Sequence, residues 1–447
     1  MNVQLAVHTF YPESSGGTEL YVLQLAKSLA RAGHAAHVLA GTPPAGRMVA
    51  SSDWEGIPVT RLACPADTDN PIRDAYDNAT VGEALRALWR DRRPDVLHVC
   101  HPGNLSTAIL TVAAEMGVPT VVTLTDFWPI CPASTLYRSD GALCSGPGDL
   151  GRCARCYASM GPRGTRYRSG VQRIPTALLH WAAAACGQVS LARPRAVAWL
   201  GALARRTAVV RARLLAADAL ICLSAFQRQT LARWGYPLAA MRRLPHGTAT
   251  PAMAVARSVP SREKGLAFGY IGPLSAHKGA HLPIEAFARL RPGRRARLMY
   301  WGAIPAPPDE YASRVLQRLE ETTNATHRGA FAPGDLPAVM GEIDVLIVPS
   351  VWYENTPMVI YEALAHRVPV IATSIGGMRE LVTEHHAGWL FARGAVEDLT
   401  AVMQARLDDP SSVAAASAAA GPAPEFEAHA REVEALCRRL VEEGRDA

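Results

Sequence analysis

Short apolar runs alternate with longer stretches of helical periodicity along most of this 447-residue chain. Apolar runs of this length that are rich in β-branched residues are typical of buried strands. Strands separated by helices favour parallel sheets with helices wound on their faces. The strands predicted in this way are 3–10, 35–41, 96–101, 120–126 and 219–224 in the first half, and 266–272, 297–301, 345–350, 368–373 and 389–391 in the second.

The strand and helix pattern starts twice, which indicates two domains. The segment TPAMAVARSVPSREKG (250–265) has no clear periodicity and is interpreted as the hinge. A chain of this length also exceeds what one ordinary core accommodates. We therefore predict an α/β protein of two doubly wound, Rossmann-like domains that face each other across a cleft. The first spans residues 1–252 and the second 264–409, and a linker and a C-terminal helix follow at 410–447.

The composition is that of a globular protein, with 49% hydrophobic and 19% charged residues. The opening MNVQLAVHTFYP resembles a first strand and lacks the features of a secretory signal. The longest weakly polar run, at 176–192, contains His180 and Gln188 and is too short to cross a bilayer. We therefore expect a cytoplasmic protein whose nine cysteines are not paired in disulfides.

The basic residues are unevenly placed. Residues 160–217 contain ten arginines but no lysine and no acidic residue, and the rest of the chain holds 36 basic and 40 acidic residues. Arginines interleaved with Trp181 and Trp199 favour contact with an anionic membrane, here the inner face, or with an acidic or diphosphate-bearing acceptor. A solvated helix face is the simpler interpretation. No recognition motif accompanies the charge, so no nucleic-acid partner is expected.

Four cysteines follow the strand 120–126 in a loop rich in glycine and proline, CPASTLYRSDGALCSGPGDLGRCARC. Four thiolates can close a tetrahedral structural zinc site, which would order a loop that has no core of its own. Free thiols are the alternative, and disulfides are less expected in a reducing compartment. The residues concerned are Cys131, Cys144, Cys153 and Cys156.

Two loops at the carboxyl ends of predicted strands have features that suit a phosphate, and such ends are where doubly wound sheets bind ligands. SSGGTE places Gly16 and Gly17 at a helix start, where free N–H groups and the dipole favour an anion. GPLSAHKG places Lys278 between a strand and a helix, where its ammonium group can meet a phosphate. A tight turn and an exposed lysine are the simpler interpretations.

The stretch WYENTPMVIYE (352–362) carries two carboxylates eight positions apart. Glu354 lies on the loop after a predicted strand, Pro357 suits the first turn of a helix, and Glu362 lies over a turn further on. Carboxylates accept paired hydrogen bonds from a vicinal diol such as a sugar or a ribose. An acidic helix start is the simpler interpretation, and a metal is disfavoured because no further ligand is suitably spaced.

The neighbouring segments repeat the pattern of a strand followed by a loop and a helix start. Asn355 or Thr356 is expected to cap the helix that contains Glu362. TSIGGMREL (373–381) then places Gly376 and Gly377 between a strand and a helix. A glycine pair between a strand and a helix thus occurs in both halves of the chain, which favours a phosphate-bearing ligand over isolated turns.

Together these motifs resemble the family-4 glycosyltransferases of GT-B fold. The resemblance rests on SSGGTE, GPLSAHKG, the pair from Glu354 to Glu362, and TSIGGMRELV followed by AGWLF, and it extends over nearly the whole chain. It implies transfer of a sugar from a nucleotide sugar to a glycan, a lipid-linked intermediate or a small metabolite. It further implies retention of configuration, no catalytic metal, an acceptor-side first domain and a donor-binding second domain.

The resemblance also implies roles for individual residues. Lys278 would pair with the donor diphosphate, Glu362 would hold the ribose, and Glu354 would lie against the sugar. The implied donor site comprises Gly16, Gly17, Lys278, Glu354, Asn355, Thr356, Glu362, Gly376 and Gly377.

Two positions depart from the family pattern. Many members carry an arginine where this chain has Pro273, and a histidine where Thr125 precedes Asp126. The catalytic residues are therefore expected to be Glu354 and Asp126, with His101 as a second candidate at the neighbouring strand end. The alternatives are a non-catalytic nucleotide-sugar-binding or assembly protein of the same fold, and an epimerase or phosphorylase. A dehydrogenase is disfavoured because no G-x-G-x-x-G follows either first strand.

Overall fold

The computed structural model describes residues 1–42, 49–63, 70–159, 170–188, 195–249, 265–291, 295–304 and 307–446. The chain forms two compact units, each with its own sheet and core. The first unit contains Met1–His246 and Phe426–Ala447, and the second contains Gly247–Glu425. The hinge predicted at 250–265 lies, except for Gly265, outside the described residues.

The first unit is built on an eight-stranded sheet in the order β3-β4-β2-β1-β5-β6-β7-β8. Neighbouring strands are parallel except β3 and β4, which form an antiparallel hairpin. The order reverses direction between β1 and β5, so the loops after these strands meet at a switch point. The strands are β1 Asn2–Val7, β2 Ala35–Thr42, β3 Val49–Trp54, β4 Ile57–Ala63, β5 Val96–Val99, β6 Thr120–Leu124, β7 Ala219–Cys222 and β8 Met241–Arg243.

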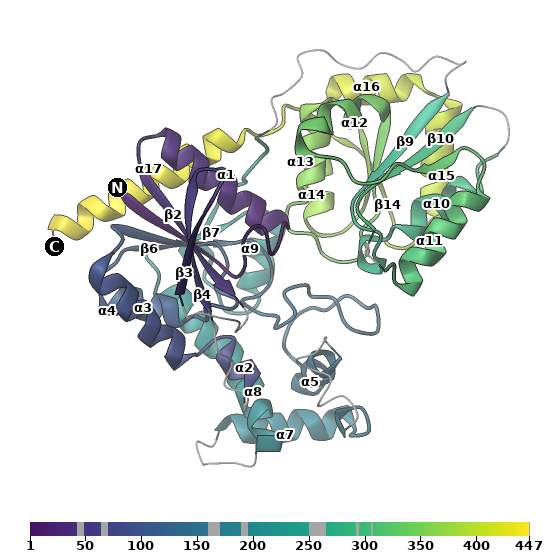
Figure 1. The fold of residues 1–447 in the computed structure, drawn as a ribbon. Coiled ribbons are helices and arrows are strands. Elements are labelled where there is room, and N and C mark those ends of the chain that lie inside the picture. The colour runs from purple at the N-terminus through teal and green to yellow at the C-terminus, as the bar shows by residue number, and fades with distance from the viewer. Residues whose placement is uncertain are drawn as a thin grey trace. The chain divides into compact units, whose positions relative to one another are not determined.

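Helices surround this sheet, and the last helix of the chain is one of them. Figure 1 shows α17 (yellow) beside α1 (purple). Phe426 and Val433 of α17 belong to the same core as Leu25 of α1, and His429 lies 2.9 Å from the Tyr21 hydroxyl. The described helices of this unit are α1 Gly17–Arg31, α2 Pro71–Asp74, α3 Ala79–Asp91, α4 Ala108–Glu115, α5 Leu150–Ala158, α7 Thr176–Gln188, α8 Arg195–Leu215, α9 Ala225–Ala232, η1 Leu238–Ala240 and α17 Phe426–Asp446.

The second unit has a six-stranded parallel sheet in the order β11-β10-β9-β12-β13-β14. This is a doubly wound order, in which the direction of winding reverses between β9 and β12. Its strands are β9 Leu266–Ile271, β10 Ala296–Trp301, β11 Ala325–His327, β12 Val345–Val348, β13 Val370–Thr373 and β14 Gly388–Phe391. Its helices are η2 Ala276–Lys278, α10 His281–Phe287, α11 Glu310–Glu321, η3 Pro333–Asp335, α12 Leu336–Glu342, α13 Met358–Ala365, α14 Gly376–Glu384, α15 Val396–Asp408 and α16 Ser411–Ala419.

All ten predicted strands are present, and the two doubly wound sheets confirm the predicted fold class. The apolar pattern misses β3, β4, β8 and β11. Most of β3 is exposed and its sequence VASSDW buries no alternating face, so it carries no strand period. Residues 411–419, inside the predicted linker, form α16 instead, because this alanine-rich segment favours a helix and buries Val413.

Candidate functional site

Lys278 and Glu354 meet at the switch point of the second sheet. Lys278 ends η2, on the loop after β9, and Glu354 lies on the loop after β12. Because β9 and β12 are neighbours, their following loops converge, and Lys278 Nζ lies 2.6 Å from Glu354 Oε1. The lysine also lies 5.2 Å from the ring centre of Trp352. The structure thus joins two residues that are 76 positions apart in sequence.

The carboxylate of Glu354 is held by several donors. Trp352 Nε1 donates to it over 2.7 Å and Ser350 Oγ over 2.9 Å. Burial acts to raise the pKa of Glu354, but the charge and hydrogen bond of Lys278, together with these donors, lower it below its usual value. Glu354 is therefore an ionised group in a fixed position.

The start of α14 packs directly against the Glu354 loop. The Gly377 N–H donates to the Glu354 carbonyl oxygen over 2.9 Å. A Cβ atom at position 377 would lie 1.6 Å from the Asn355 carbonyl oxygen, so only glycine fits there. Gly376 has φ +55°, which also favours glycine. Close packing thus requires glycine at position 377, and the positive φ favours glycine at position 376.

Glu362 lies one turn into α13, beyond the same loop. Burial raises the pKa of Glu362 to about 7, and no neighbouring charge is among the causes of this shift. A ligand that donates hydrogen bonds to such a carboxyl group stabilises its ionised form. The predicted cap is wrong: Pro357 occupies the N-cap position, while Asn355 is buried and Thr356 half-buried nearby.

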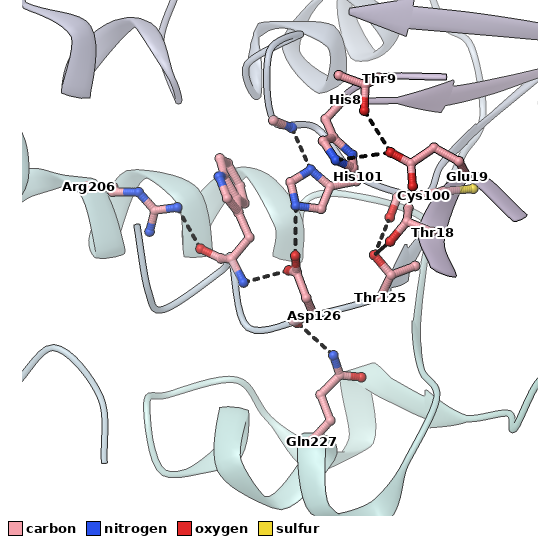
Figure 2. A network of polar contacts seen from close by, with 12 residues as sticks. His8, Thr9, Thr18, Glu19, Cys100, His101, Thr125, Asp126, Arg206 and Gln227 are labelled. Atoms are coloured by element: carbon pink, nitrogen blue, oxygen red, sulfur yellow. Dashed lines mark hydrogen bonds and ion pairs between the residues drawn. The ribbon is translucent and has the colours of Figure 1, made fainter. Parts of the chain in front are cut away.

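In the first unit, Asp126, His101 and His8 follow three neighbouring strands of the sheet. Asp126 lies after β6, His101 after β5 and His8 after β1. Figure 2 shows their polar contacts, in which His101 Nε2 lies 3.0 Å from Asp126 Oδ2. The Trp128 N–H donates to Asp126 Oδ1 over 2.7 Å, and Gln227 donates to the Asp126 carbonyl. The predicted pair Asp126 and His101 is thus in direct contact.

The hydrogen bonds of His101 define which ring nitrogen faces Asp126. The Gly103 N–H donates to His101 Nδ1 over 2.9 Å, so the ring proton lies on Nε2 and is donated to Asp126. Burial acts to raise the pKa of Asp126, but the charge and hydrogen bond of His101 outweigh it and lower that pKa. The Asp126 side chain is 31% exposed and that of His101 only 7%. Asp126 is therefore the more accessible residue of the pair, and His101 holds its carboxylate from the buried side.

Sequence reasoning missed His8 and Glu19 in this network. The His8 and His101 rings lie 4.3 Å apart, and His8 Nε2 lies 3.5 Å from Glu19 Oε1. Burial, and then the charge of His101, lower the pKa of His8 to about 4, so it is neutral near pH 7. Its Nδ1 is buried without a hydrogen-bond partner among the described residues. The available signal was its place at the end of the first strand.

The start of α1 lies beside this network. Gly16 is the N-cap and Gly17 the first residue of α1, and both are exposed. Thr18 donates to Thr125 over 3.1 Å, and Thr125 donates to the Cys100 carbonyl. These bonds fix the helix start relative to the end of β6, and a role for the two glycines in phosphate binding stays a prediction.

The arginines of α8 are largely used within the first unit. Arg205 donates to carbonyl groups of α7, Arg206 to the Trp128 carbonyl, and Arg211 to the Trp234 carbonyl. Arg213 pairs with Asp77 at 2.6 Å. These four arginines therefore do not form a free basic surface. Arg163, Arg166, Arg168 and Arg193 of the arginine-rich segment lie outside the described residues.

All four predicted metal-ligand cysteines line one cavity of about 270 Å³ and carry free thiols. Among the described residues, no group of three or more His, Cys, Asp or Glu side chains lies close enough together to coordinate a metal ion. The structure thus brings the four cysteines together without itself defining a metal site.

Two sequence profiles of known families match the chain. Residues 16–247 match the profile described as "Glycosyl transferase 4-like domain", and residues 265–409 match "Glycosyl transferases group 1". Among curated proteins, the chain is similar to two from Streptomyces kanamyceticus. It is 32% identical to "2-deoxystreptamine glucosyltransferase" over 156 residues and 28% identical to "Alpha-D-kanosaminyltransferase" over 142 residues. These matches cover 34% and 32% of this chain, and only 39% and 36% of the length of those relatives.

Solved structures match over almost the whole chain. "Sucrose-phosphate synthase (tll1590) from Thermosynechococcus elongatus" gives a TM-score of 0.63 at 18% identity and covers 98% of each chain. Anabaena Alr3699/HepE, solved in complex with UDP and glucose, gives 0.57 at 16% identity, covering 100% of this chain and 99% of its own. Similarity at this level of identity establishes the shared fold.

Proposed function

The chain belongs to the family-4 glycosyltransferases of GT-B fold, and from this premise we propose that it transfers a sugar from a nucleotide-sugar donor to an acceptor with retention of configuration. The observation that carries the proposal is the meeting of Lys278 and Glu354 at the switch point of the second sheet. The acceptor class is a glycan, a lipid-linked intermediate or a small metabolite.

Lys278 is the proposed contact for the donor diphosphate. Its ammonium group is fixed by Glu354. The loop that carries Glu354 packs against the start of α14, where N–H groups and the dipole also favour an anion. Pro273 supplies no second positive charge to the diphosphate. Lys278 therefore has to neutralise a larger share of the diphosphate charge. Glu354 then lies on the sugar side of the diphosphate and Glu362 on the ribose side.

Asp126 is the proposed residue for the acceptor hydroxyl group. Its carboxylate is ionised, partly exposed, and oriented by His101 and the Trp128 N–H. An acceptor-only oxygen in this position can accept a hydrogen bond from a sugar hydroxyl and so orient it for attack. The proposed transfer relies on orientation and on stabilisation of the departing diphosphate, and needs no catalytic metal.

Replacing Glu362 by Gln is expected to weaken nucleoside diphosphate binding about tenfold at pH 8, because a charged acceptor for the ribose hydroxyls is lost. With its pKa near 7, Glu362 should bind ribose better as pH rises from about 6 to about 8, since only the ionised form accepts from both hydroxyls. Calorimetric titration across this range measures both effects.

The pH dependence of binding separates Glu362 from the phosphate, which also ionises in this range. The phosphate contribution stays in Glu362→Gln, whereas the part due to the carboxyl disappears. Glu310→Gln on α11 is the matched control, because Glu310 is 88% exposed and pairs with exposed Arg314. Equal affinities and pH profiles for wild type and Glu362→Gln would refute the ribose role.

A non-catalytic nucleotide-sugar-binding protein of the same fold is the second candidate, favoured by Pro273 and Thr125 in place of the arginine and histidine of many members. It predicts binding of a sugar nucleotide with Lys278 and Glu354 intact, but no release of nucleoside diphosphate with any acceptor. Acceptor-dependent release would instead support the transferase and would also exclude an epimerase.

We also propose that α7 contacts an anionic membrane surface. Trp181 is 72% exposed and Leu178 57%, and their spacing of three residues places them on one face of α7. Ile174, 39% exposed, and exposed Arg173 lie just before the helix begins. None of the helices that the structure describes is both long enough and apolar enough to cross a bilayer. The exposed apolar face, rather than the arginines of α8, supports this contact.

The double substitution Leu178→Ser and Trp181→Ser is expected to lower binding to phosphatidylglycerol vesicles at least about tenfold, because two large side chains lose their burial in the interface. Flotation with vesicles measures it, and neutral phosphatidylcholine vesicles test the charge contribution. Leu238→Ser is the control, since Leu238 is 48% exposed on a different element. Equal flotation of wild type and the double variant would contradict the proposal.

A further inference from the structure

The four cysteines after β6 belong to a cavity that the proposed transfer does not use. Cys131 and Cys144 lie on the loop between β6 and α5, and Cys153 and Cys156 lie three residues apart on α5. Residues at this spacing share one face of a helix. Their side chains, those of Arg138 and Arg152, and the ring of Trp234 line the cavity of about 270 Å³.

Backbone N–H groups point at the sulfur atoms of this cavity. The Gly146 N–H donates to Cys144 Sγ over 3.4 Å. The Leu136 and Ala133 N–H groups likewise form hydrogen bonds with Cys131 Sγ. Donors of this kind stabilise thiolates more than thiols, because a charged acceptor makes the stronger hydrogen bond. The Cys144 thiol also donates to the Gly146 carbonyl oxygen over 3.4 Å. The N–H donors would favour the thiolate form when a cation is bound.

Arg206 supplies the second, independent observation. Its side chain is 2% exposed, and it donates to the Trp128 carbonyl and stacks on the Trp128 ring at 4.5 Å. Figure 2 shows it beside the loop that carries Asp126. No carboxylate among the described residues pairs with it, and its Nη1 is buried without a hydrogen-bond partner. A buried cation of this kind needs an anion nearby.

The groups that act on the charge of Arg206 include the thiol of Cys131 and the carboxylate of Asp126. Without a cation among them, four thiolates that line one cavity would repel each other. A divalent ion removes this repulsion and leaves a net negative site that offsets the charge of Arg206.

We propose that Cys131, Cys144, Cys153 and Cys156 bind one structural zinc ion as thiolates. Tetrahedral coordination by four cysteines is a common structural zinc site. Because no three of these ligands yet stand at metal spacing in the described residues, binding draws the sulfurs inward and closes the cavity. The proposal rests on the thiols and Arg206, so it stands or falls independently of the transferase activity.

The proposed ion would also fix the loop that carries Asp126. Cys131 lies five positions after Asp126, and its N–H donates to the Phe127 carbonyl over 2.9 Å. Arg206 connects the same loop to α8. Metal binding is therefore expected to raise the protection of the 126–159 segment in hydrogen exchange, a readout that does not depend on catalysis.

Elemental analysis of the full-length protein purified without chelator tests the proposal, with about one zinc per chain expected. Cobalt(II) titration of the metal-stripped protein should give the intense visible bands and sulfur charge-transfer absorption of a tetrahedral thiolate site. Both wild-type measurements avoid the risk that a variant fails to fold.

Cys153→Ser should lose the metal, while Cys186→Ser should keep it, because Cys186 is a half-buried thiol on α7 outside the cavity. A folded protein that neither contains zinc nor binds cobalt through sulfur overturns the proposal. Iron in place of zinc, disulfides among the four cysteines, or equal metal content in the two variants would also overturn it.

Discussion

Replacing Lys278 by Met is expected to lower the turnover of sugar transfer about 10²- to 10³-fold. The substitution removes the fixed positive charge proposed to stabilise the departing diphosphate, while Met keeps much of the side-chain volume. Its effect is large here because Pro273 provides no second charge. Steady-state release of nucleoside diphosphate from the donor measures the change in kcat.

A loss of activity in Lys278→Met has a competing explanation, because Glu354 would keep a largely buried charge without its cation. Removal of one partner of such a pair costs up to about 3 kcal/mol, less than for a fully buried pair since Lys278 is 27% exposed. The double variant Lys278→Met with Glu354→Gln removes both charges and should recover thermal stability. Turnover that returns with stability would contradict the proposed role of Lys278.

Asp126→Asn is expected to lower turnover about 10²- to 10⁴-fold with little change in donor affinity, because the charged acceptor for the incoming hydroxyl is lost. The amide oxygen can still accept from His101 Nε2, so the local fold should be retained. Measurement of kcat together with the dissociation constant of the donor separates the two effects.

Asp77→Asn is the matched control for Asp126→Asn, since Asp77 is 48% exposed and pairs with Arg213. His101→Ala should have a smaller effect than Asp126→Asn, because His101 acts through the orientation of Asp126. If His101→Ala proves the more damaging change in a folded protein, the reactive group is His101 and the assignment to Asp126 is wrong.

Much of the fold could be predicted because buried parallel strands are nearly continuous apolar runs. This signal fails for β3, where exposed Ser51, Ser52 and Asp53 pack against no core, and for β11, which has only three residues. The return of α17 to the first unit was also not predictable, since amphipathicity shows that a helix packs but not on what.

The donor-site residues could be proposed from motifs because each motif follows a predicted strand: Gly16 and Gly17 follow the first strand of the first sheet, and the other residues follow strands of the second sheet. The contact between Lys278 and Glu354 could not, because it depends on β9 and β12 being neighbours. His8 was missed because the predicted strand 3–10 placed it inside the strand, whereas β1 ends at Val7. Arg206 was grouped with a basic surface, because an arginine-rich run does not reveal which guanidinium is buried.

The most direct test of the central claim, that the switch point of the second sheet binds a nucleotide sugar, is calorimetric titration of the protein with a panel of nucleoside diphosphates and their sugar derivatives. We predict that at least one base gives saturable binding. We further predict that this binding is weakened in Glu362→Gln and in the double variant Lys278→Met with Glu354→Gln. Absence of binding across the panel, or affinity unchanged in both variants, would contradict the account.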